Sequence, residues 1–132
     1  MSKTIRLYHA TNKENVPSIK KSGLYSDSSG MVYFSTTEKD ALRFMQVNYG
    51  GGFFKPREEY IVIPFDLPED WVHILDHGKT YEQYFGKVYA LLDEVRPRCA
   101  GNQRGLPAEY IPNSLEDLPV FVIERQDPPK VL

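Results

Sequence analysis

The sequence has very little cysteine, since Cys99 is the only one in 132 residues. A single thiol cannot form an intrachain disulfide, and it excludes a zinc site built on paired cysteines. Disulfides are rare in reducing compartments. The shortage therefore favours a soluble protein of the cytoplasm.

Long apolar runs are missing as well. No stretch approaches the about 18 apolar residues that span a membrane, and the N-terminus lacks the apolar core of a signal peptide. The formal net charge of −2 gives no bulk attraction to nucleic acid, so a protein partner is favoured. The length suits one domain, which we assign to residues 1–126, followed by a loose Pro-rich tail at 127–132.

The first patterned stretch runs from Ile5 to Thr11 and predicts a short strand that His9 closes. This places an imidazole where a strand passes into a helix, and such junctions expose polar groups to ligands. A lone turn histidine is more often simply half-buried. His9 alone therefore does not indicate a functional site, and further residues with a matching pattern are needed.

A helix is predicted after this strand, over residues 12–22. Thr11 and Glu14 have the spacing of a capping box, and Gly23 supplies the stop. Pro17 conflicts with a helix that begins directly after Thr11. The helix therefore begins near Asn15, or its first turn is irregular.

The remaining elements mix helices and strands without regular alternation, which favours an α+β fold with a mixed, split sheet and flanking helices. Thr36 or Thr37 caps one helix, a second capping box begins at Thr80, and Pro64 marks a frayed end or an edge position of its strand. The predicted strands cover residues 31–35, 60–65, 71–75, 109–111 and 120–123, and the helices cover 38–49 and 80–92.

Three residues in a fixed order give the chain its functional signal. His9 ends the first strand, Tyr33 precedes a Ser-Thr-Thr step, and Glu109 begins a strand after a loop. This order resembles the His–Tyr–Glu branch of the ADP-ribosyltransferase fold, to which diphtheria-toxin-like and poly-ADP-ribose-polymerase-like enzymes belong. The resemblance is carried by Tyr8-His9-Ala10-Thr11, Ser18-Ile19 with Gly23-Leu24, Val32-Tyr33-Phe34-Ser35 and Glu109-Tyr110-Ile111.

The resemblance implies that NAD binds in a cleft between two half-sheets. His9 would hydrogen-bond a ribose hydroxyl, and the backbone at Ala10 would bracket the nicotinamide amide. Tyr33 and Phe44 would stack on the two faces of the nicotinamide ring, and Glu109 would bind the 2′-hydroxyl of the nicotinamide ribose. The implied catalytic residues are His9, Tyr33 and Glu109, and the implied NAD-binding residues are Tyr8, His9, Ala10, Thr11, Tyr33, Ser35 and Phe44.

The implied activity is that of a metal-independent mono-ADP-ribosyltransferase, a glycosyltransferase that uses NAD as substrate. The segment from Tyr25 to Gly30 corresponds to the donor-site loop, and that from Arg96 to Pro107 corresponds to the acceptor-contacting loop. A protein acceptor is favoured over nucleic acid. A cognate inhibitor or antitoxin would be a further partner of a toxin-like member.

Departures from the family pattern keep other functions open. Ala41 stands where a serine often binds the nicotinamide amide, and Pro107 stands where arginine-modifying relatives carry Glu or Gln. Glu124 is the rival to Glu109. The alternatives are an NAD-hydrolysing toxin, an inactive module that binds NAD or a partner, and an RNA 2′-phosphotransferase, whose added arginines find no match here. His73 and His77 lack metal-like partners.

Overall fold

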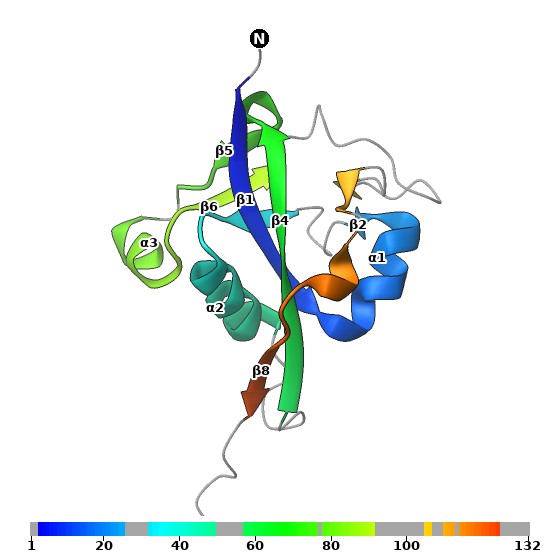
Figure 1. Cartoon of the computed structure of the whole chain (residues 1–132). Coiled ribbons are helices and arrows are strands. Elements are labelled where there is room, and N and C mark those ends of the chain that lie inside the picture. Colours follow the sequence, from blue (N-terminus) through cyan, green and yellow to red (C-terminus); the bar gives the residue numbers. More distant parts are fainter. Residues whose placement is uncertain are drawn as a thin grey trace, which may run out of the picture.

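A computed structural model describes residues 3–25, 32–49, 57–76, 78–91, 105–106, 110–112 and 114–124 and confirms the α+β class (Figure 1). The strands are β1 (Thr4–Asn12), β2 (Leu24–Tyr25), β3 (Tyr33–Ser35), β4 (Arg57–Pro68), β5 (Val72–Ile74), β6 (Val88–Leu91), β7 (Gly105–Leu106) and β8 (Phe121–Glu124). The α-helices are α1 (Val16–Ser22), α2 (Glu38–Tyr49) and α3 (Lys79–Phe85), and the 3-10 turns are η1 (Lys13–Asn15), η3 (Glu69–Trp71) and η7 (Leu115–Asp117).

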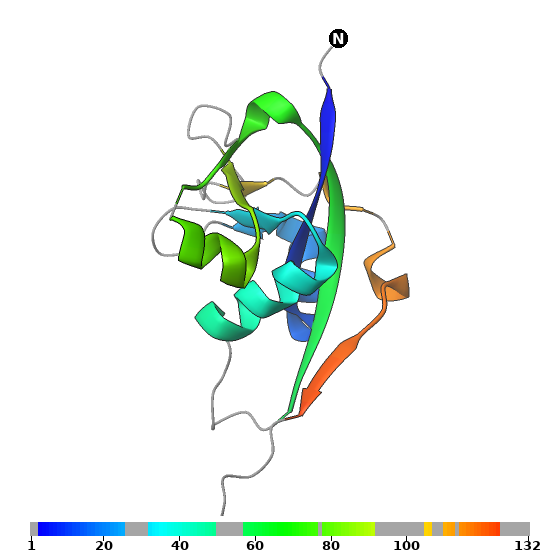
Figure 2. The same cartoon turned by 90° about the vertical axis from the view of Figure 1, so that its left-hand side faces the viewer.

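Six strands form one sheet in the order β5-β6-β3-β1-β4-β8, and β2 pairs with β7 in a separate ribbon. Every pairing in the described residues is antiparallel, so the prediction of a mixed sheet is wrong. β1 and β4 pair along the whole of β1, from Thr4 opposite Pro68 to Asn12 opposite Tyr60. Figure 2 shows β8 beside the far end of β4.

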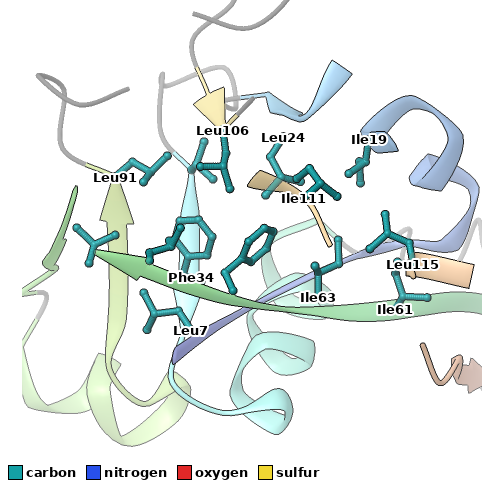
Figure 3. Packing of buried hydrophobic residues seen from close by; sticks show 14 residues of the cluster. Leu7, Ile19, Leu24, Phe34, Ile61, Ile63, Leu91, Leu106, Ile111 and Leu115 are labelled. Atoms are coloured by element: carbon teal, nitrogen blue, oxygen red, sulfur yellow. The ribbon is translucent and has the colours of Figure 1, made fainter. Parts of the chain in front are cut away.

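Alternating side chains give β1 and β4 two apolar faces. Leu7 and Ile63, both fully buried, point into the main core together with Phe34 and with Ile19 of α1 (Figure 3). Burying one such side chain stabilises the fold by about 1.5–3 kcal/mol. The opposite face, which includes Ala10 and Val62, packs against α2. The sheet is therefore covered on both sides.

The junction after β1 differs from the predicted capping box. β1 continues past His9 to Asn12, so His9 does not close the strand. Thr11 is a buried strand residue whose Oγ1 accepts a hydrogen bond from Asn15 Nδ2 at 3.2 Å. The first turn is irregular, as Pro17 predicted, because η1 precedes α1.

α2 has the cap that the sequence predicts. The backbone N–H of Asp40 donates to Thr37 Oγ1 at 3.1 Å, which satisfies one of the free donors of the first turn. Pro64 lies inside β4, opposite Tyr8, and not at a frayed end. Its other side is an edge, because β8 pairs with β4 only between Arg57 and Tyr60 in the described residues. Proline is tolerated there because it has no ladder bond to donate.

The prediction of a helix from residue 80 to 92 is wrong in its second half. α3 starts after Gly78, so Thr80 lies inside the helix and does not cap it. The helix ends at Phe85, with Gly86 as its C-cap. The chain then forms β6, where Ala90 pairs with Tyr33 of β3. Apolar spacing alone did not distinguish a helix from a buried strand here.

The C-terminal part is confirmed at β8 and corrected before it. Tyr110 and Ile111 lie in a 3-10 turn and a bend, and Gly105–Leu106 forms β7 within the predicted acceptor loop. Glu109, the rest of that loop and the tail at 127–132 lie outside the described residues. No helix within the described ranges is both long and apolar enough to cross a membrane.

Candidate functional site

The candidate site lies where β1 and β3 part from each other. Among the described residues these strands pair at one register position only, Tyr8 opposite Ser35. One residue further along β1, His9 Nδ1 lies 2.8 Å from the main-chain oxygen of Tyr33. A side-chain hydrogen bond thus joins the two strands where their backbone pairing ends. In the strand order of the six-stranded sheet, this single register pair joins β5-β6-β3 to β1-β4-β8.

The His9 imidazole is held in one state by its surroundings. Burial lowers the pKa of His9, and the hydrogen bond to the Tyr33 carbonyl opposes that shift without cancelling it. The ring is therefore neutral near pH 7. A carbonyl oxygen only accepts, so Nδ1 carries the proton and Nε2 presents a lone pair. The edge contact with Phe34, at 5.9 Å between ring centroids, fixes the ring further.

A polar pocket of about 210 Å³ opens beside His9, between β1 and α1. Its polar lining comes from His9, Thr11, Asn15 and Ser18. Leu24, which pairs with Leu106, brings the β2-β7 ribbon to the same pocket. The volume lies below the about 300–1,000 Å³ of sites that hold drug-sized ligands. The pocket therefore suits a sugar-sized part of a larger molecule.

The other half of the predicted site lies on the opposite face of the sheet. Tyr33 and Phe44 contact each other with ring centroids 5.2 Å apart and planes tilted by 48°. Phe44 also packs edge-on against Phe85 of α3, at 5.6 Å. Because Phe44 belongs to α2, this pair lies on the α2 side of the sheet. Because His9 and this pair face opposite sides of the sheet, one ligand would contact both only at the place where β1 and β3 share a single register pair.

The predicted binding residues fall into two groups. His9 and Thr11 line the pocket on the α1 side. Tyr8 and Ala10 lie on the α2 side with the aromatic pair, and the buried Ser35 lies opposite Tyr8 at the single register pair. The structure thus brings these residues close to the single register pair between β1 and β3, some on one face of the sheet and some on the other.

The two candidate carboxylates differ in position along the chain. Glu109 lies outside the described residues, although Leu106, three residues before it, pairs with the pocket residue Leu24. Glu124 pairs with Arg57, whereas His9 pairs with Ile63. Six residues of β4 separate those two positions, or about 20 Å at about 3.3 Å per residue. The backbone of Glu124 is therefore remote from His9.

Asn15 and Ser18 are pocket residues that sequence reasoning missed as ligand contacts. The signal was present: they are three apart on the segment that follows His9, a spacing that puts two side chains on one helical face. His73 is exposed in β5, and His77 lies outside the described residues. Within the described part of the chain, no group of three or more His, Cys, Asp or Glu residues could hold a metal ion.

A second, larger hollow of about 600 Å³ lies at the far end of β1 and β4. It is lined by charged side chains that include Lys13, Arg57 and Glu59, and both cations approach Glu59. Glu58 is 5% exposed and accepts a hydrogen bond from the buried Tyr60 hydroxyl. The lining carries three carboxylates, from Glu14, Glu58 and Glu59, against these two cations, so the hollow offers no excess of positive charge to an anionic ligand.

Comparison of the chain with protein-family models, with curated proteins and with solved structures found no match.

Proposed function

We propose that the chain is an NAD-dependent mono-ADP-ribosyltransferase that transfers ADP-ribose to a protein acceptor. The observation that carries the proposal is the parting of β1 and β3, bridged by His9 beside a polar pocket. The resemblance implies an NAD cleft between two half-sheets with the histidine at its sugar-binding end. The half-sheets β5-β6-β3 and β1-β4-β8 are consistent with that expectation.

His9 is suited to orient a sugar. Its Nδ1–H is committed to the Tyr33 carbonyl, so the Nε2 lone pair can accept a hydrogen bond from a ribose hydroxyl. A neutral, rigid acceptor costs little to reorganise when the ligand binds. Thr11, Asn15 and Ser18 supply further polar groups in the same pocket. In this proposal the pocket holds the ribose part of NAD.

Tyr33 and Phe44 are proposed to hold the nicotinamide ring. Stacking on an aromatic ring contributes about 0.5–1.5 kcal/mol per pair beyond burial. Ala10, next to His9, would offer its backbone to the carboxamide. Ala41 is buried against the sheet and has no hydroxyl to add a second contact.

Glu109 is the proposed catalytic carboxylate. Breaking the bond between nicotinamide and ribose leaves the electron pair on nicotinamide and positive charge on the sugar, as in glycoside hydrolysis. A fixed carboxylate near the ribose stabilises this charge. The acceptor then donates its lone pair to the sugar carbon and loses a proton. Glu124 is disfavoured because its backbone is about 20 Å from the level of His9 along β4.

The test is release of nicotinamide from NAD by the purified protein in a cell extract, with mass spectrometry of the proteins that gain ADP-ribose. Glu109→Gln is expected to lower turnover about 100-fold or more. Glu124→Gln is the matched control and should retain it. Turnover that survives Glu109→Gln but is lost in Glu124→Gln would reverse the assignment.

The same assay separates the alternatives. NAD consumption without any acceptor would indicate an NAD hydrolase. An inactive binding module is the second candidate, and the missing hydroxyl at Ala41 together with the contact between Tyr33 and Phe44 favours it. Binding of NAD by calorimetry without release of nicotinamide would support that candidate. No turnover and no binding would overturn both.

A further inference from the structure

The Tyr33–Phe44 pair is closed in this structure. A flat ring between two others needs about 7 Å between them, twice the about 3.5 Å contact distance of carbon atoms. The observed separation is 5.2 Å, and the 48° tilt leaves no parallel slot. A nicotinamide ring therefore enters only after one of the two rings moves.

Of the two rings, Phe44 is the one that can move, and its movement toward Phe85 depends on α3. Tyr33 belongs to β3 and is paired with Ala90 of β6, so its backbone is fixed by the sheet. Phe44 lies on α2, which is anchored to the sheet by buried Ala41. Its side chain is covered by Phe85 of α3, which is itself buried and packs against Tyr81 at 4.8 Å. Moving Phe44 away from Tyr33 toward Phe85 therefore means displacing α3.

α3 is built as a short rigid body between two glycine joints. Gly78 has φ +90 and ψ 170, and Gly86 has φ +70 and ψ −163. Both conformations belong to a region of backbone space that is essentially limited to glycine. Within the helix, Glu82 N–H donates to Gly78 O and Gly86 N–H donates to Glu82 O. The seven residues between the glycines can thus turn as a unit.

Arg43 of α2 holds this unit in place. Its Nη1 donates to the Tyr84 carbonyl at 3.1 Å, and its guanidinium carbon lies 5.3 Å from the centroid of the Tyr84 ring. Tyr84 is half exposed, so the contact lies at the surface of the molecule. One side chain thereby ties the outer face of α3 to α2.

We infer that α3 is a hinged cap over the Tyr33–Phe44 pair, latched by Arg43, and that the nicotinamide ring binds by opening it. This inference rests on the proposed function. Arg43 is a positioning residue, because it acts through α3 and touches no ligand. Since a ligand of the open form is weakened by the rarity of that form, releasing the latch strengthens apparent binding.

The experiment compares Arg43→Ala and Tyr84→Ala with the control Lys39→Ala, which removes a cation one turn away on the same helix. Without ligand, the ring signals of Phe85 in nuclear magnetic resonance spectra are expected to shift in both latch variants, because α3 moves away from Phe44. Hydrogen exchange at the Glu82 and Gly86 amides should not change, because their bonds turn with the unit. The Leu91 amide, bonded to Val32 O in the sheet, should not change. Calorimetry with NAD is expected to give a Kd lower by about threefold or more in both latch variants, with no change in Lys39→Ala.

The outcomes are separable. NAD binding that weakens or stays constant in the latch variants would overturn the cap, since a merely structural contact lowers affinity when lost. Unchanged ring signals of Phe85 in both latch variants would overturn the role of Arg43 as latch. Absence of NAD binding in every variant would instead overturn the proposed function, and with it the ligand assigned to the cap.

Discussion

The imidazole of His9 donates its Nδ1 hydrogen to the main-chain oxygen of Tyr33 across 2.8 Å, where the backbone ladder between β1 and β3 ends. A strand residue thus replaces, with its side chain, the hydrogen bond that the neighbouring backbone no longer makes. The same imidazole therefore stabilises the sheet through its Nδ1–H and offers Nε2 to a ligand in the proposed site.

His9→Asn should separate these two roles. The asparagine amide N–H can take the place of Nδ1–H, so the bond to the Tyr33 carbonyl is kept, whereas the Nε2 acceptor is lost. His9→Ala removes both, and the unsatisfied carbonyl should cost about 1–3 kcal/mol of unfolding free energy. Urea titration should rank the Asn variant above the Ala variant in stability, while both lose NAD binding. Equal destabilisation by both would show that the bond contributes little.

The unfolding free energy should fall as the pH is lowered from about 7.5 through about 6.5, the ordinary pKa of histidine. Burial lowers the folded-state pKa of His9. As the pH falls, the unfolded chain therefore binds the proton at a higher pH than the folded chain does, and this stabilises the unfolded chain relative to the folded one. One proton gives a slope of at most about 1.4 kcal/mol per pH unit. Denaturant titrations between pH 5.5 and 7.5 would measure it.

His9→Asn is the control for this pH dependence and should reduce the slope. Asp66 and Glu116 do not contribute in this window, because hydrogen bonds from Arg6 and Lys20 lower the pKa of both carboxyls. A slope that is the same in the variant would assign the pH dependence to other groups.

Gly86→Ala should destabilise the fold more than Gly78→Ala. Both glycines have backbone angles that cost about 1–3 kcal/mol for other residues. A Cβ at Gly86 would in addition force the Asp40 carboxylate to shift, whereas a Cβ at Gly78 meets open space. Thermal unfolding of the two variants tests the difference. The reverse order would contradict the close approach of Asp40 to Gly86.

Thr37→Ala should cost about 1 kcal/mol, because it removes the side-chain oxygen that caps α2 at Asp40. Thr37→Ser should restore most of the stability. Thr80→Ala is the comparison, since Thr80 lies inside α3 and alanine has the better helix propensity. Chemical unfolding is expected to show a loss only for Thr37→Ala. A similar loss at Thr80 would mean that its hydroxyl has a role in α3.

Local signals in the sequence predicted several elements well. The α2 cap at Thr37 and the apolar β8 follow from short-range rules that tertiary packing did not override. The predicted helix to residue 92 failed because Val88 and Leu91 fit both a helical face and a buried strand. Only the pairing of β6 with β3 and β5 decides between them, and that pairing is not local.

The candidate site was predictable in its residue types but not in its arrangement. His9 and Tyr33 were chosen from their order along the chain. That their side chains lie on opposite faces of the sheet depends on the register of β1 against β3, which is set by one pair, Tyr8 and Ser35. Asn15 and Ser18 were missed because the orientation of α1 over β1 is a tertiary property.

The single register pair between β1 and β3 also has a mechanical consequence. In the described part of the six-stranded sheet, the other neighbouring strands share three or more register pairs. β1 and β3 are joined by one register pair, by the His9 hydrogen bond, and by the packing of Phe34 against His9 and Phe65. The tilt of β5-β6-β3 against β1-β4-β8 is therefore fixed by fewer register pairs than the tilt between any other neighbouring strands in the described part of this sheet. A molecule bound across this seam would set that tilt, and its influence would reach β5 and β8 at the outer margins, which it never touches.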